Sequence, residues 1–130
     1  MNWFLRWSRF NLVGALGTGF QLAVLALLNR LSGHYLITST AAIELTLLHN
    51  FAWHIHYTWR DRRHSRWTQL VRFHLSNGVV SVAGNLALMP LLVRGAHMPI
   101  LAANGTVILC CSIVNFLLGD CWAFRRITQV

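Results

Sequence analysis

Residues 48–60 read LHNFAWHIHYTWR, and residues 113–125 read IVNFLLGDCWAFR. In both stretches an apolar run ends in Asn-Phe, and after seven intervening residues an aromatic residue is followed by arginine, as Trp59-Arg60 and Phe124-Arg125. A further aromatic residue stands two positions before each of these pairs. The two copies are 65 residues apart in a chain of 130 residues, so the sequence predicts an internal duplication.

The composition indicates a membrane protein. Of the residues, 55% are hydrophobic and only 11% are charged, whereas an ordinary soluble domain carries about a quarter charged residues. The formal net charge of +8 comes from eleven arginines against three acidic residues. A net positive charge of this size is also found in proteins that bind nucleic acids. Here, however, the charged residues lie between long apolar runs, as at the edges of membrane helices. We therefore expect no nucleic-acid partner.

Four apolar runs are each long enough for a transmembrane helix, which needs about 20 residues. The expected spans cover about 10–28, 35–57, 73–93 and 100–122. Nine of the eleven arginines lie in the two tails and in the long connection between the second and third spans. Because arginine accumulates on the cytoplasmic side of membranes, we expect both termini to be cytoplasmic. The predicted fold is an all-α integral membrane protein with four transmembrane helices.

The duplication includes the first span of each half. Arg9-Phe10 opens the first span, and Arg72-Phe73 opens the third. We place the first repeat at about residues 9–60 and the second at about residues 72–125. Because each repeat holds two spans, both halves enter the membrane from the same side. The fold is therefore expected to consist of two parallel-related two-helix repeats, with their axis along the membrane normal.

The chain resembles the GtrA-like family. The resemblance rests on Arg-Phe at the start of spans one and three, and on Asn-Phe and aromatic-Arg at the end of spans two and four. The resemblance covers about residues 9–125 and implies a single GtrA-like membrane domain, residues 1–130. It implies translocation of a polyprenyl-phosphate-linked sugar across the cytoplasmic (inner) membrane, for cell-surface polysaccharide or glycan modification. The lipid-linked sugar and membrane lipid are the partners that it implies. It leaves open two others, a polyprenyl-phosphate glycosyltransferase and a second copy of the chain in a homo-oligomer.

Two other functions compete with translocation. A non-transporting membrane subunit would anchor or orient a partner glycosyltransferase through the arginine- and tryptophan-rich connection at 58–72. A small cation or drug exporter would also have four spans, but it would need a carboxylate in the first span, where this chain has none. The sequence contains no Ser-His-Asp set, Gly-rich phosphate loop or paired carboxylates, and its histidines and cysteines lack metal-ligand spacing. We therefore expect no enzymatic activity, no cofactor and no metal.

Arg9 and Arg72 are the first candidate substrate-binding residues. Both are expected at the cytoplasmic N-terminus of a span, where a guanidinium fork and exposed helix N–H groups together suit a phosphate. The alternative is anchoring of the helix by positive charge alone. Asp61 stands among arginines in the long connection and is expected to act as their local counter-charge.

Four amide side chains inside the spans are further candidates. Asn50 and Asn115 are expected roughly two turns inside the cytoplasmic edge, where an amide needs partners and a hydrogen bond between helices contributes on the order of 1 kcal/mol. These two residues either pair across the pseudo-symmetric core or bind a sugar hydroxyl or a phosphate oxygen. The same alternatives hold for Gln21 and its repeat partner Asn85.

The second span holds the last candidate, Glu44, near the bilayer midplane, where a carboxylate is costly. Glu44 is expected to be protonated, to pair with an arginine or histidine, or to line a sugar or proton path. The second repeat has Leu109 at the matching position. One helical arc of about 120° holds Thr40, Glu44, Asn50 and His54. His49 and His56 are expected on the opposite side, so this polar arc is predicted to face something other than lipid.

Overall fold

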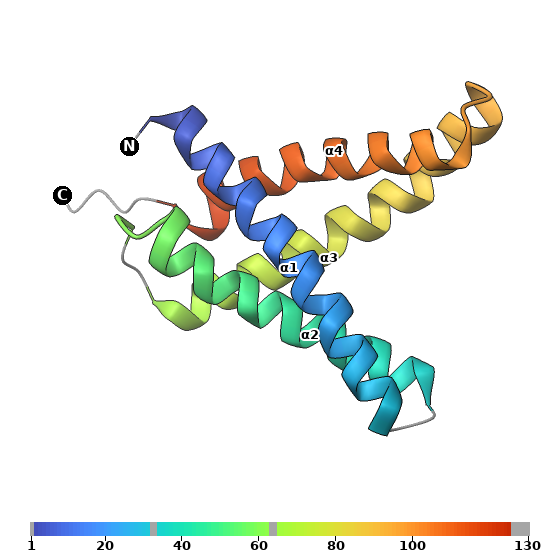
Figure 1. The fold of residues 1–130 in the computed structure, drawn as a ribbon. Coiled ribbons are helices and arrows are strands. Elements are labelled where there is room, and N and C mark those ends of the chain that lie inside the picture. Colours follow the sequence, from blue (N-terminus) through green and yellow to red (C-terminus); the bar gives the residue numbers. More distant parts are fainter. Residues whose placement is uncertain (1, 32–33, 63–64, 126–130) are drawn as a thin grey trace. The chain divides into compact units, whose positions relative to one another are not determined.

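The computed structural model describes residues 2–31, 34–62 and 65–125, which form helices joined by short turns (Figure 1). Arg63 of the long connection and Arg126 of the C-terminal tail lie outside the described residues. The chain divides into two compact units, residues 1–62 and 63–130. The first contains α1 (Trp3–Leu31), α2 (Tyr35–Trp53) and the π-helical turn η1 (His54–Thr58). The second contains α3 (Arg66–Pro90), the π-helical turn η2 (Leu91–Gly95), α4 (Ile100–Leu118) and the π-helical turn η3 (Gly119–Ala123).

The first unit is a helical hairpin in which α1 and α2 pack along narrow stripes. The buried residues of α1 are Arg6, Phe10, Val13 and Gly17. Their spacing of three or four positions places them on one face of the helix. In α2 the buried positions recur every four residues, at Thr38, Ala42 and Thr46. Several of these side chains are small, which lets membrane helices approach closely.

The second unit is a hairpin that buries matching positions. The buried residues of α3 are Gln69, Phe73 and Ser76, each 63 positions after Arg6, Phe10 and Val13. In α4 they are Ala103, Val107, Asn115 and Phe116, each 65 positions after Thr38, Ala42, Asn50 and Phe51. Of these residues, only Asn50 is half-buried rather than buried. The two hairpins therefore use the same stripes of their helices for packing.

A π-helical turn ends the second helix of each unit. The residues that follow η1 and η3, Trp59 and Phe124, have nearly the same backbone conformation (φ −119°, ψ 36° and φ −114°, ψ 36°). The Trp59 N–H donates to the His54 carbonyl oxygen at 2.7 Å, and the Phe124 N–H donates to the Gly119 carbonyl oxygen at 2.9 Å. A π turn is wider than an α-helical turn, and both aromatic rings after it are fully buried.

Three helices in the described part of the chain are long and apolar enough to cross a membrane. They are Trp3–Leu31, Arg66–Gly95 and Ile100–Ala123, which contain 18-residue stretches with mean hydropathies of 1.7, 1.5 and 2.0. The sequence predicts a further span at about 35–57, but α2, which carries Glu44, His49 and Asn50, is not among these three helices. Large apolar side chains are exposed along the helices, as on a surface that faces lipid. The chain is thus an all-helical, multi-pass membrane protein.

The first helix of each unit begins earlier than the sequence predicts. α1 begins at Trp3 rather than near Phe10, and α3 begins at Arg66 rather than near Phe73. In α1 the extension is stabilised by packing, because Arg6 lies one turn before Phe10 on the same buried stripe. Arginines that the sequence places in tails and connections therefore lie inside helices.

Candidate functional site

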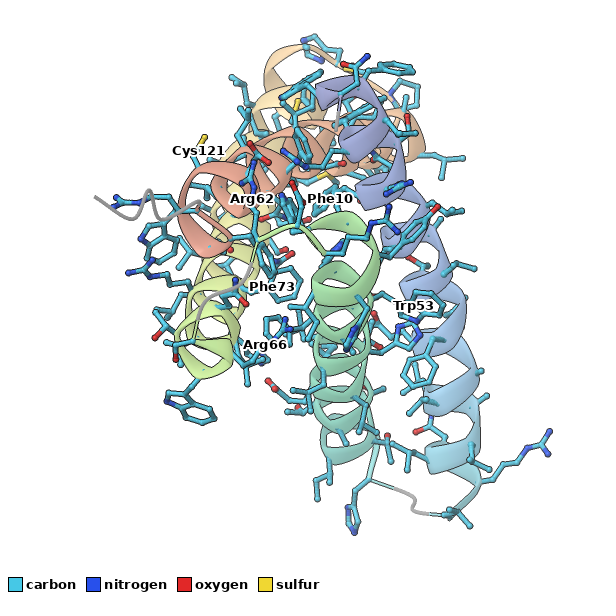
Figure 2. All side chains as sticks on the ribbon, turned by 90° about the vertical axis from the view of Figure 1, so that its left-hand side faces the viewer. Phe10, Trp53, Arg62, Arg66, Phe73 and Cys121 are labelled. Carbon is cyan, nitrogen blue, oxygen red and sulfur yellow. The ribbon has the colours of Figure 1, made fainter. Side chains whose placement is uncertain are left out.

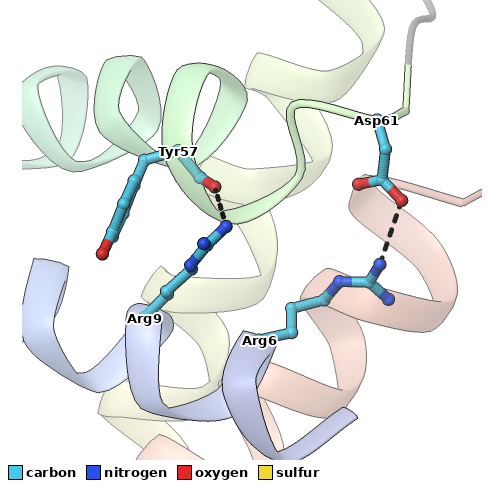
Figure 3. A network of polar contacts seen from close by, with 4 residues as sticks. All are labelled: Arg6, Arg9, Tyr57 and Asp61. Atoms are coloured by element: carbon cyan, nitrogen blue, oxygen red, sulfur yellow. Dashed lines mark hydrogen bonds and ion pairs between the residues drawn. The ribbon is translucent and has the colours of Figure 1, made fainter. Parts of the chain in front are cut away.

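In the first unit, Arg9 lies against the end of the second helix. Its Nη1 donates a hydrogen bond to the Tyr57 carbonyl oxygen at 3.3 Å (Figure 3). The guanidinium carbon lies 4.7 Å from the centroid of the Tyr57 ring, which is within the range of a cation–π contact. Arg9 therefore joins the second turn of α1 to η1.

The second unit repeats this arrangement with Arg72. The Arg72 Nη1 donates to the Trp122 carbonyl oxygen, also at 3.3 Å, and the guanidinium carbon lies 5.7 Å from the centroid of the Trp122 ring. Tyr57 and Trp122 are the aromatic residues that stand two positions before the aromatic-Arg pairs of the sequence. The same set of arginine, carbonyl group and aromatic ring thus occurs in both hairpins.

Neither arginine stands at a helix N-terminus, so this part of the sequence-based prediction is wrong. α1 begins six residues before Arg9, and α3 begins six residues before Arg72. Only the first four N–H groups of a helix lack an intrahelical partner, so the backbone N–H groups beside either guanidinium are bonded within the helix. A phosphate at these arginines would be bound by side chains.

A cavity of about 400 Å³ lies beside Arg9 and is lined by Leu5, Arg9, Arg60 and Asp61. Asp61 forms an ion pair with Arg6, whose Nη2 donates to the carboxylate at 3.1 Å (Figure 3). Asp61 is therefore a counter-charge, as predicted, but its ion-pair partner is Arg6 of α1 rather than an arginine of the long connection. Because Arg6 neutralises Asp61, the other two arginines dominate the charge of the cavity, which suits an anion.

Sequence reasoning missed Arg6, although its spacing could have identified it. Arg6 precedes Phe10 by four positions and Val13 by seven, which is the register of one helix face. An arginine that packs on this face needs a nearby anion. The only acidic residue of the long connection is Asp61, so the pair could have been proposed from the sequence.

Aromatic rings pack beneath the arginine of each hairpin. Phe10 stacks on His54 with ring centroids 5.0 Å apart, and Trp59 packs edge-on against the two rings at 5.9 and 5.1 Å. In the second unit Phe73 packs against Phe124 at 5.9 Å. His54, which the sequence places in the polar arc of the second span, is therefore held between aromatic rings in the hairpin core.

Asn50 and His49 both contact α1. The His49 ring stacks on Phe20 with centroids 4.4 Å apart, and its Nδ1 lies 3.3 Å from the Asn50 Oδ1. The Asn50 carboxamide lies directly against Gly17. The prediction that His49 lies opposite the polar arc is therefore wrong, because an imidazole at a flanking position is long enough to reach the neighbouring helix.

The remaining candidate residues are distributed over both units. Asn115 is 9% exposed inside the second unit, and Gln21 is half-buried on α1. Asn85 is exposed and donates to a carbonyl oxygen of its own helix at 2.9 Å. Glu44 is exposed on α2 and lies about 20 Å before Tyr57 along the helix, at 1.5 Å per residue. Glu44 therefore lies far from the cavity beside Arg9.

Comparison with known proteins identifies one family. The family model described as GtrA/DPMS, transmembrane domain, matches residues 9–124. The match begins at Arg9 and ends at Phe124, so it includes most of both hairpins, the whole first copy of the sequence motif and all of the second copy except Arg125. None of the curated proteins matches the chain.

Proposed function

The chain belongs to the GtrA/DPMS transmembrane-domain family, and from this premise we propose that it translocates a polyprenyl-phosphate-linked sugar across the cytoplasmic membrane. The lipid-linked sugar then serves cell-surface polysaccharide or glycan modification. The observation that carries the proposal is one arrangement found in both hairpins, Arg9 on Tyr57 and Arg72 on Trp122. A duplicated guanidinium site suits the charged group that all such lipids share, the phosphate.

The proposed membrane architecture has four spans, with α2 and η1 together as the second. Both termini and the long connection lie on the cytoplasmic side of the inner membrane, where nine of the eleven arginines gather. The two hairpins are products of a duplication and are related by an axis along the membrane normal. The buried stripes that recur after 63 and 65 residues support the duplication.

In the proposed mechanism the head group leaves water while its chain stays in lipid. Arg9 and Arg72 offset part of the cost of desolvating the phosphate, because charge-assisted hydrogen bonds are roughly twice as strong as neutral ones. Asn50 and Asn115 lie about 10 Å deeper along their helices and bond the head group next. The other polar residues of the path are Gln21, Glu44 and Asn85. Translocation makes and breaks no covalent bond, so the proposal includes no catalytic residue and no cofactor.

A second candidate function is that of a non-transporting subunit that orients a polyprenyl-phosphate glycosyltransferase. The start of α3 favours it, because Arg66 is exposed and Trp67 is 73% exposed. Arginine and tryptophan are both enriched where proteins meet. The two candidate functions make different predictions for the purified chain. A translocase carries the lipid-linked sugar across the membrane by itself, and a non-transporting subunit does not.

Reconstitution of the purified chain in liposomes tests the proposal. The liposomes contain polyprenyl-phosphate-glucose in both leaflets, and periodate added outside oxidises only glucose that reaches the outer leaflet. Translocation predicts oxidation of nearly all the glucose. Arg9→Ala/Arg72→Ala is expected to slow this oxidation, and Arg94→Ala, which changes a turn arginine, is expected to leave it unchanged. Inner-leaflet glucose that stays protected with the parent chain would exclude translocation and favour the second candidate.

A further inference from the structure

A row of aromatic rings follows one flank of α2 and η1 in the first unit. Trp53 lies one helical turn from His49 and one from Tyr57, with ring centroids 6.3 and 6.5 Å away. Phe20 of α1 stacks on His49 at one end of this aromatic row, and the Arg9 guanidinium covers Tyr57 at the other. Figure 2 shows Trp53 on the side of α2 that is next to α1.

The second unit keeps only the last member of the aromatic row. Val114 and Leu118 stand 65 positions after His49 and Trp53, and only Trp122 preserves an aromatic ring. A duplication gives both halves the same features at first, so a feature present in one half reflects what that half does alone. The aromatic row is thus a property of the first unit, and a ligand that needs it is recognised by that unit alone.

The Trp53 ring is fixed by a hydrogen bond inside the aromatic row. Its Nε1–H donates to the His49 Nε2 at 3.0 Å. Because an indole N–H can only donate, Nε2 accepts, and the His49 proton lies on Nδ1, which faces the Asn50 Oδ1. A tryptophan that anchors a helix at the membrane surface turns its N–H to the wet side. The Trp53 N–H is used within the protein, and the ring remains 46% exposed.

The exposed ring lines a cavity of about 230 Å³ together with Ala52 and His56. Ala52 is too small to cover the ring, and the lining of the cavity is almost entirely apolar. Sites for small ligands are lined mostly by apolar and aromatic side chains. Trp53 lies about 6 Å from Tyr57 along the helix axis, and the Arg9 guanidinium lies over the Tyr57 ring, so the ring that lines the cavity lies one helical turn from the residue that Arg9 covers.

We propose that this cavity binds the sugar ring of the lipid-linked substrate, stacked on Trp53, while Arg9 binds the phosphate. The inference rests on the proposed function and adds that the first unit alone recognises the sugar. One face of a sugar ring carries polarised C–H groups, and the electron-rich face of indole attracts them as it attracts the positive edge of another ring. A polyprenyl chain offers apolar area only, so its burial depends on the area of the cavity wall and needs neither an aromatic face nor a fixed ring orientation. An ordered indole therefore favours the sugar as the occupant.

Lipid binding to the full chain in nanodiscs, followed by native mass spectrometry, tests this proposal. The probes are polyprenyl phosphates that carry glucose, galactose or mannose, and the same polyprenyl phosphate without a sugar. The parent chain is expected to bind at least one glycosylated lipid about threefold to tenfold more tightly than the bare lipid, the gain of one aromatic contact. Trp53→Leu, which copies Leu118 of the second unit, is expected to abolish this preference and to keep bare-lipid affinity. Trp53→Phe retains a ring and is expected to keep part of the preference.

Trp67→Leu is the matched control, because it removes an exposed tryptophan outside the aromatic row. It is expected to keep the full preference for the glycosylated lipid. A preference that survives Trp53→Leu would overturn the proposal, and so would an equal loss of bare and glycosylated lipid, which would place the polyprenyl chain in the cavity. A parent chain that binds bare lipid without preferring any sugar also overturns this inference. If the parent chain bound none of the four lipids, the proposed function itself would be wrong.

Discussion

Gly17 and Asn50 depend on each other, because a Cβ atom at position 17 would overlap the Asn50 carboxamide. The glycine lets α1 approach α2 at the point where Asn50 lies beside His49. At Gly14 and Gly19, in the same helix, an added Cβ would meet no atom within 4 Å. Gly17 is thus the glycine of α1 that close packing requires.

Gly17→Ala is expected to displace the Asn50 carboxamide and to lower the free energy of unfolding by about 1–3 kcal/mol, the usual cost of overpacking. Gly14→Ala is the matched control and is expected to raise stability by up to about 1 kcal/mol through helix propensity. Unfolding in mixed detergent micelles, followed by circular dichroism, measures both. In an Asn50→Ala background the cost of Gly17→Ala should disappear. A cost that persisted there would mean that another group is displaced.

Replacement of Arg72 is expected to impair delivery of the lipid-linked sugar in two steps. Arg72→Lys keeps the charge but loses the planar fork that can bond the Trp122 carbonyl oxygen and a phosphate together. Arg72→Ala also loses the charge, and we expect about a tenfold decrease for one lost charge-assisted hydrogen bond. External sugar transfer in cells with matched membrane levels of each variant gives the measurement. Full transfer by Arg72→Ala would reduce the arginine to an anchor of the helix.

Trp59→Ala is expected to lower the free energy of unfolding by about 3–5 kcal/mol, as for other large buried side chains. The ring is 0% exposed and packs against Phe10 and His54. Trp67→Ala, at an exposed position, should change stability by less than about 0.5 kcal/mol. Denaturant titration of both variants in the same detergent compares them. Equal effects would contradict the packing of Trp59 in the hairpin core.

Reporter fusions are expected to place both tails and the long connection in the cytoplasm. A reporter after Val130 or between Asp61 and Trp67 should score cytoplasmic, and reporters at Leu31 and Gly95 should score external. The combination of an external Leu31 with a cytoplasmic connection tests whether α2 crosses the membrane. A cytoplasmic Gly95 would reverse the proposed orientation.

The extent of the second helix in each hairpin could be predicted from the sequence. The expected ranges 35–57 and 100–122 compare with 35–58 and 100–123 in the structure when the π turns are included. Polar turns before these helices and aromatic-Arg pairs after them are local signals. The starts of the first helices have no such local signal, and only the register of Arg6 with Phe10 and its long-range pair with Asp61 indicate that α1 begins before Arg9.

The sequence also predicts that Arg9 and Arg72 occupy equivalent positions in the two repeats. It does not predict which groups the two side chains contact. The carbonyl oxygens of Tyr57 and Trp122 lie in π-helical turns, and the sequence pattern contains no signal for the wider turn. His49 shows a related limit. A helical wheel gives the direction in which a side chain leaves the helix, whereas the stacking of His49 on Phe20 depends on the neighbouring helix.

The two helices of a hairpin differ in length, and this difference has a mechanical consequence. α1 has 29 residues and the helix Arg66–Gly95 has 30, whereas Ile100–Ala123 has 24. At 1.5 Å per residue these helices measure about 44, 45 and 36 Å, against a hydrocarbon core of about 30 Å. Arg6 and Arg9 bond to Asp61 and Tyr57, so they lie level with the end of the second helix of the hairpin. Hydrophobic mismatch that moves this end of the hairpin into or out of the headgroup layer moves both guanidinium groups with it, which couples their depth to the thickness of the bilayer.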